Sequence, residues 1–197
     1  MNARQPATAL AIDPGHTGAL ALVVGDRLVG WAAWSKMRRK REPYRWTAST
    51  IRDDRSAPCL AHAIRACLVH LPPDSDLPWG TPCAVEGLRP HGAKSGYTQL
   101  CEAAGVAVAV LYPHMGIASR PLWSAWIPSV LGIRANTAPE EQENNALAAW
   151  GWPPYGFRRR KPWPMGVGDA SAVPKPPAWA ISHVADAGCM ARFILAP

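Results

Sequence analysis

Two apolar runs of this chain end in a carboxylate, and a polar pair lies near its C-terminus. Asp13 follows Leu10-Ala11-Ile12, and Glu86 follows Cys83-Ala84-Val85. Each short run predicts a buried strand, and the glycines that follow predict turns. His183 and Asp186 are three residues apart, so a helix would present them on one face. If the two strands are neighbours in one sheet and the helix packs on it, these four polar side chains would meet at one place.

Each of these residues also has a purely structural explanation. Asp-Pro-Gly is an ordinary turn sequence, and Arg89 is near enough to neutralise Glu86. An Asp near a helix N-terminus is favoured by the helix dipole. The combination points further, because carboxylates at adjacent strand ends repel each other unless a cation joins them. Hard divalent cations prefer carboxylate oxygens as ligands, and a site for such a cation can also include one neutral His. Sites that hold two divalent cations in this way cut phosphodiesters.

Hydrophobic periodicity predicts alternating strands and helices, which indicates a mixed α/β fold with a five-stranded mixed sheet flanked by helices. At 197 residues the chain is expected to form one domain over residues 1–197, with a basic loop near 36–55 and a Pro/Trp-rich insertion near 151–177. Gly105 is expected to cap the second helix and Ser182 to cap the last one. The strands are expected at 8–13, 19–24, 27–34, 82–86 and 106–112, and the helices at 57–71, 96–104, 119–131, 139–150 and 182–195.

The net charge of +7, from 21 basic and 14 acidic residues, favours a polyanionic partner. The basic residues are clustered in two runs, at 36–41 and 158–161, which strengthens the expectation of nucleic-acid binding. Two solvated loops would produce the same pattern.

The five cysteines form no Cys-x-x-Cys pair, and most lie in apolar segments. Buried free thiols in a reducing cytoplasm are the simplest interpretation, and a structural zinc site is not expected. No apolar run is long enough to span a membrane, and the N-terminus has no separate signal-peptide core, so a membrane partner is not expected either.

The motifs Ile12-Asp13-Pro14-Gly15-x-x-Gly18, Val85-Glu86 and His183-x-x-Asp186-Ala187 resemble those of the RuvC family of Holliday junction resolvases, in the RNase H-like superfamily. The resemblance covers most of the chain, and the spacing from Glu86 to Gly105 also matches. Each motif is short and unspecific by itself. Their order and spacing make the set fairly specific.

The resemblance implies an RNase H-like fold and an endonuclease that cuts four-way junctions or other branched DNA. Asp13, Glu86, His183 and Asp186 would be the catalytic residues and would bind two Mg²⁺ or Mn²⁺ ions roughly 4 Å apart. One ion would activate water and the other would stabilise the leaving 3′ oxygen. The family acts as a homodimer, so that two sites cut two strands symmetrically.

The chain departs from the family pattern at its basic residues. Arg89 stands where the family commonly has an aromatic residue, which leaves the sequence preference at the crossover open. Either Lys161 or Lys175 could hold the scissile phosphate. The two long insertions indicate a divergent, phage-type relative with a broader range of substrates. DNA contacts are expected from Arg38, Arg39, Lys40, Arg41, Arg89, Lys94, Arg158, Arg159, Arg160 and Lys161.

Three other interpretations stay open. The first is another RNase H-like nuclease, which would cut branched DNA generally or an RNA–DNA hybrid. The second is an inactive DNA-binding relative, although the intact acidic set argues against it. The third is a sugar-kinase-like ATPase, which also begins with Asp and Gly after its first strand. That fold needs a second, similar half, and 197 residues leave little room for one.

Overall fold

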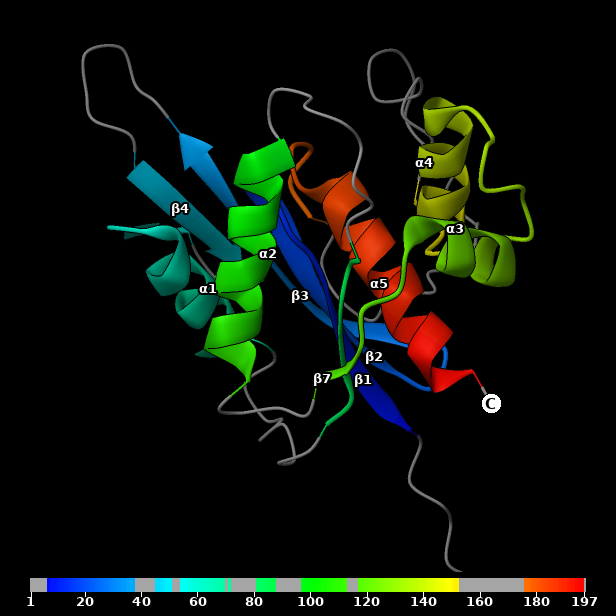
Figure 1. The fold of residues 1–197 in the computed structure, drawn as a ribbon, viewed down its shortest axis with the longest axis horizontal. Coiled ribbons are helices and arrows are strands. Elements are labelled where there is room, and N and C mark those ends of the chain that lie inside the picture. Colours follow the sequence, from blue (N-terminus) through cyan, green and yellow to red (C-terminus); the bar gives the residue numbers. More distant parts are fainter. Residues whose placement is uncertain are drawn as a thin grey trace, which may run out of the picture.

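The computed structural model describes residues 7–37, 45–50, 54–69, 71, 81–87, 97–112, 117–152 and 176–196. In this part of the chain, seven strands form one sheet in the order β5-β4-β3-β2-β1-β6-β7, and five α-helices flank it (Figure 1). The strands are β1 (Thr8–Asp13), β2 (Thr17–Val24), β3 (Arg27–Met37), β4 (Arg45–Thr50), β5 (Asp54–Ala57), β6 (Cys83–Val85) and β7 (Ile117–Ser119). The helices are α1 (Leu60–Val69), α2 (Tyr97–Leu111), α3 (Trp123–Trp126), α4 (Pro139–Ala148) and α5 (Ile181–Leu195).

The sheet is mixed. Strands β1 to β5 pair antiparallel in sequence order, whereas β6 runs parallel to β1 and β7 runs parallel to β6. The predicted mixed α/β fold is confirmed, and the arrangement is consistent with the RNase H-like fold that the resemblance implies. The predicted number of strands was too low, because two further strands extend the edge beyond β3.

The central strands are buried on both faces, and their residues alternate between two cores. Leu10 and Ile12 of β1 pack in the core beneath α1 and α2. Ala9 and Ala11 pack in the opposite core, which contains α5 and Trp150. Coverage of both faces explains why these strands appear in the sequence as continuous apolar runs rather than as alternating ones.

Helix α5 lies directly across β1 and β2 (Figure 1). Small residues meet at this contact, with Ala19 and Ala21 on β2 and Ala187 and Ala191 on the helix, all fully buried. Small side chains let the helix approach the sheet closely, so polar groups on α5 can reach the ends of the central strands.

The prediction of a loop over 36–55 is wrong for the residues that the structure describes there. Lys36 and Met37 belong to β3, and β4 and β5 follow as two antiparallel strands. Trp46 and Ala48 of β4 both pack in the core beneath α1 and α2, so the segment has the period-two burial pattern of a strand. The basic and hydroxyl residues around it hid this pattern, since they lower the hydrophobicity of the segment.

The predicted strand at 106–112 is also wrong, because α2 continues through Gly105 to Leu111. A continuous apolar run fits a buried strand or a buried helix equally well. Ala103, Ala104 and Ala107 are buried at helical spacing, which places one face of α2 against the sheet. Gly105 has open space around it and caps nothing. The strand that pairs with β6 is β7, which comes later in the chain.

The helix predicted at 119–131 is divided in two. Helix α3 ends at Trp126, and a wider π-helical turn spans Ile127–Leu131. Pro128 stands at the start of this turn, where its missing N–H cannot continue the regular hydrogen-bond ladder. Gly132 then ends the turn in a left-handed conformation, which glycine adopts without strain.

All five cysteines are free thiols, as predicted, but only Cys67, Cys83 and Cys189 are buried. Burial raises the pKa of these three thiols, so they are unreactive packing residues. Cys59 and Cys101 are exposed. Within the described residues, none of the helices is both long enough and apolar enough to cross a membrane.

Candidate active site

The parallel pairing of β1 with β6 brings Asp13 and Glu86 together. Ile12 is the register partner of Val85, so the next residue on each strand is the acid. The backbone N–H of Glu86 donates a hydrogen bond to the carbonyl oxygen of Ile12, with an N···O distance of 3.0 Å. Since Ile12 and Val85 both face the α1–α2 core, the two acids that follow them face α5.

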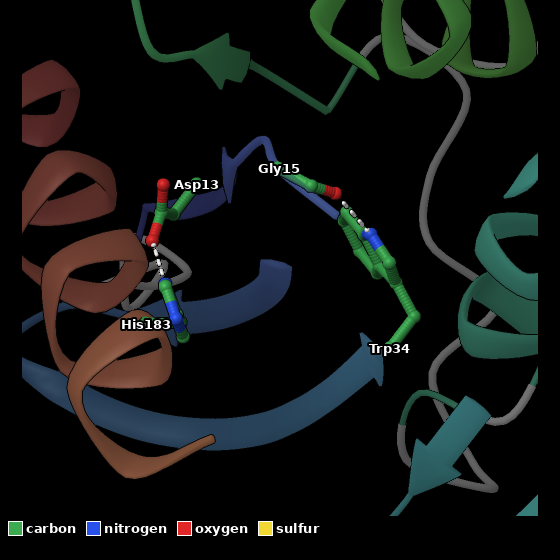
Figure 2. Close-up of polar contacts among 4 residues, drawn as sticks. All are labelled: Asp13, Gly15, Trp34 and His183. Atoms are coloured by element: carbon green, nitrogen blue, oxygen red, sulfur yellow. Dashed lines mark hydrogen bonds and ion pairs between the residues drawn. The ribbon is translucent and has the colours of Figure 1, made fainter. Parts of the chain in front are cut away.

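Helix α5 supplies the other two predicted residues, His183 and Asp186. Nδ1 of His183 lies 2.5 Å from Oδ2 of Asp13, and the two side chains form an ion pair when the imidazole is protonated (Figure 2). The helix begins after Ala180, without a side-chain cap. The prediction that Ser182 caps it is therefore wrong, and Ser182 lines the site instead.

A buried indole holds the turn that follows Asp13. Nε1 of Trp34, on β3, donates a hydrogen bond of 2.9 Å to the carbonyl oxygen of Gly15 (Figure 2). Gly18 allows this packing, because a Cβ there would lie 2.6 Å from the Trp34 ring and 2.7 Å from the carbonyl oxygen of Asp13. Both glycines of the first motif thus position the backbone around Asp13.

All four predicted residues line one pocket of about 300 Å³. A volume of this size has room for hydrated ions and a phosphate group. No Lys or Arg is present among the described residues that line it. The described residues that line it are Asp13, Glu86, Trp126, Ile127, Pro139, Gln142, Glu143, Ser182, His183 and Asp186.

Burial dominates the electrostatics of the pocket. It raises the pKa of Glu86 to about 8, and the charge of Asp13 adds to the rise, while Trp126 and His183 oppose it. It also raises the pKa of Asp186 well above its ordinary value, with further contributions from the charges of Asp13 and Glu86. The carboxyl group of Glu86 therefore retains its proton near neutral pH unless a cation approaches it, and that of Asp186 ionises less readily than an exposed aspartic acid.

His183 experiences opposing effects. Burial lowers the pKa of its imidazole, but the hydrogen bond that the ring donates to Asp13 and the charges of Asp13 and Asp186 outweigh burial, so the pKa is raised. The ring is 33% exposed and Asp13 is 14% exposed, so solvent and small ions can reach both groups. In the metal-free state the pair is stabilised as imidazolium and carboxylate.

The donor set fits a hard divalent cation in its chemistry. Carboxylate oxygens predominate, they are buried together, and the described lining has no Lys or Arg to neutralise them. Within the described residues, however, no three His, Cys, Asp or Glu side chains are placed so that they could hold a metal ion together. Asp13 and His183 are bonded to each other instead, and separation of this pair would make both available as ligands.

Sequence patterns did not identify Glu143 as a pocket residue, because acids near the start of a helix have an ordinary explanation in the helix dipole. A signal was present, because Glu143 precedes the buried residues Ala146, Leu147 and Trp150 by three, four and seven positions. An acid on the buried face of a helix requires a polar or cationic partner. The aromatic and proline residues of the lining gave no comparable signal.

The predicted DNA-binding residues lie outside the described residues, as do the alternative phosphate ligands Lys161 and Lys175. This applies to Arg38 to Arg41, Arg89, Lys94 and Arg158 to Lys161. Most of the Pro/Trp-rich insertion, from 153 to 175, also lies outside them. Their roles stay predictions.

The metal-free protein is expected to lose stability as the pH rises from about 5 to about 8, where Glu86 ionises in the folded protein. The pKa values of Glu86, Asp186 and His183 are all raised, so the folded state keeps protons that the unfolded chain has already released in this range. Melting temperatures in EDTA should therefore fall across the range. Glu86→Gln, which cannot ionise, should flatten the fall. A melting temperature that rises with pH would contradict the assignment of these raised pKa values.

No protein-family model matches the chain, and no curated protein sequence matches it. Among solved structures, the chain is similar to RuvC of Thermus thermophilus, with a TM-score of 0.40 and 12% sequence identity. The alignment covers 93% of this chain and 90% of the RuvC chain. A likeness this distant does not identify a function, so the function has to be argued from the site.

Proposed function

We propose that the protein is a metal-dependent endonuclease that cuts branched DNA, with four-way junctions as its main substrate. The main support is the meeting of Asp13, Glu86, His183 and Asp186 in one pocket. They come from two adjacent parallel strand ends and from the helix that crosses them. Buried carboxylates are suited to divalent cations and, through them, to a phosphodiester, and no Lys or Arg is present among the described lining residues to compete with the cations.

Before a cation can bind, three of the four residues have to release a proton. His183 can ligate a cation only through a neutral nitrogen, so the proton between His183 and Asp13 must leave first. Glu86 and Asp186 have raised pKa values, which favour their neutral forms, so they must also ionise before they can bind a cation. The four side chains would then hold two ions, which supply an activated water and stabilise the leaving 3′ oxygen.

The active form would be a homodimer, because a four-way junction presents two equivalent strands to be cut. The basic segments at 38–41 and 158–161, with Arg89 and Lys94, would bind the phosphates of its arms. Such binding weakens as salt increases, since each neutralised phosphate releases a condensed counterion. These assignments follow from the charge of the segments and from the resemblance to the RuvC family.

Cleavage of a panel of labelled substrates tests the proposed function. The panel contains a synthetic four-way junction, a three-way junction, a flap, linear duplex DNA and an RNA–DNA hybrid, each with Mg²⁺, Mn²⁺ or EDTA. Paired symmetric cuts in the four-way junction, only with metal, are expected. Preferred cutting of the hybrid would instead identify a different RNase H-like nuclease. Junction binding without cleavage under any metal would indicate an inactive DNA-binding protein.

A further inference from the structure

Helix α4 brings a fourth carboxylate, that of Glu143, to the pocket. Glu143 is only partly exposed and lies on the face of α4 that carries the buried residues Ala146 and Leu147, with buried Trp150 just beyond the helix. This face packs against α5, the helix that carries His183 and Asp186. The carboxylate therefore belongs to the wall of the pocket rather than to the solvated surface of the helix.

Contacts at both ends of α4 fix the position of Glu143. Near the N-terminal end, Nε2 of Gln142 donates hydrogen bonds to the carbonyl oxygens of Ala135 and Thr137, at 3.0 Å and 2.6 Å. Beyond the C-terminal end, Nε1 of Trp150 donates a 3.1 Å hydrogen bond to the carbonyl oxygen of Ala185. Ala185 directly precedes Asp186, so the two helices hold their pocket residues in a defined relation.

The helix itself does not require an acid at this position. Glu140 and Glu141 already occupy the first turn, where negative charge interacts favourably with the helix dipole. Glu143 lies beyond that turn, and its charge is close enough to Asp186 and His183 to act on both. A further negative charge beside these carboxylates adds to their mutual repulsion, and divalent cations in the pocket would offset that repulsion.

We infer that Glu143 is a further cation ligand, which allows the protein to hold two divalent ions before DNA binds. This inference rests on the proposed function for the nature of the pocket. The other three carboxylates supply three negative charges and neutral His183 supplies none, whereas two divalent ions carry four positive charges. Glu143 completes the balance in the DNA-free protein. Without it, the second ion depends on the charge of a substrate phosphate.

Counting the ions bound to the DNA-free, full-length protein tests this role. Mn²⁺ would be titrated into the wild type, Glu143→Gln and Glu141→Gln, with free Mn²⁺ measured by electron paramagnetic resonance. The wild type and Glu141→Gln should bind two ions per chain. Glu141 is the matched control because it is exposed and lies on the same helix. Glu143→Gln should keep one ion and bind the second about 10-fold or more weakly.

Thermal unfolding in EDTA separates a ligand role from a structural one. Glu143→Gln removes a negative charge from the acidic pocket, so its melting temperature without metal should equal or exceed that of the wild type. Its stabilisation by Mn²⁺ should be smaller. A reduced melting temperature in EDTA with two ions still bound would overturn the inference, and so would a wild type that binds one ion or none.

The outcomes also separate this inference from the proposed function. A wild type that binds two ions, loses one in Glu143→Gln and cuts no substrate would support the role of Glu143 and refute the nuclease. A wild type that cuts junctions while Glu143→Gln binds both ions with unchanged affinity would support the nuclease and refute the role of Glu143.

Discussion

Asp13→Asn is expected to reduce cleavage of a four-way junction by about a thousandfold or more while leaving junction binding almost unchanged. Asp13 is at the end of β1, beside Glu86, which directly follows β6, and it is bonded to His183 on α5. It also lines the same pocket as Asp186. An amide has nearly the same shape as a carboxylate but is a much weaker ligand for a hard cation. Neutralising one acid also reduces repulsion of the phosphate, so affinity should not fall.

Single-turnover cleavage and gel-shift affinity, measured on the same junction, would check this prediction. Asp26→Asn is a suitable control, because Asp26 is an exposed acid in the turn between β2 and β3 and has no part in the pocket. It should cut at the wild-type rate. Asp13→Asn cutting at the wild-type rate with Mg²⁺ would show that the active site has been assigned to the wrong residues.

The elements that could be predicted from the sequence are those whose burial requires apolar residues throughout. The apolar runs of β1, β2 and β3 were recognisable, because these central strands are covered on both faces. The tight Gly25-Asp26 turn also marked where β2 ends and β3 begins. Strand β4 lies near the edge of the sheet, where hydroxyl and basic residues are tolerated, so its pattern was weak. The stretch 106–112 was ambiguous, because only tertiary packing decides whether an alanine- and valine-rich segment forms a helix or a strand.

The same contrast applies to the site. Asp13 and Glu86 were predictable because a carboxylate directly after a buried strand is unusual, and His183 and Asp186 because their spacing matches one helical face. Glu143 was not predicted, since several acids at the start of a helix have an ordinary explanation in the helix dipole. Its spacing from Ala146, Leu147 and Trp150 was a weak signal, and the packing of α4 on α5 makes the distinction from Glu140 and Glu141 clear. The hydrogen bond between Asp13 and His183 likewise depends on tertiary structure.

Trp150→Ala is expected to lower the free energy of unfolding by about 3–5 kcal/mol, a large fraction of the stability of a domain this size. The Trp150 side chain is completely buried between α4 and α5. Its indole donates to the carbonyl oxygen of Ala185, and the guanidinium of Arg192 lies 3.9 Å from the centre of its ring. Removing the ring leaves a cavity and loosens the two helices that carry Glu143 and Asp186, so Mn²⁺ affinity should also fall.

Urea unfolding followed by far-ultraviolet circular dichroism would measure this effect, and two glycine substitutions control for it. A Cβ on Gly188 would lie 2.6 Å from the Trp150 ring, so Gly188→Ala should destabilise the protein by about 1–3 kcal/mol. Gly105, in α2, has no atom within 4 Å of such a Cβ, so Gly105→Ala should stabilise it by about 0.5–1 kcal/mol. The same chemical change in two helices should therefore have opposite signs. If Gly188→Ala stabilised the protein as much as Gly105→Ala, Trp150 could not occupy the space between α4 and α5 that this explanation requires.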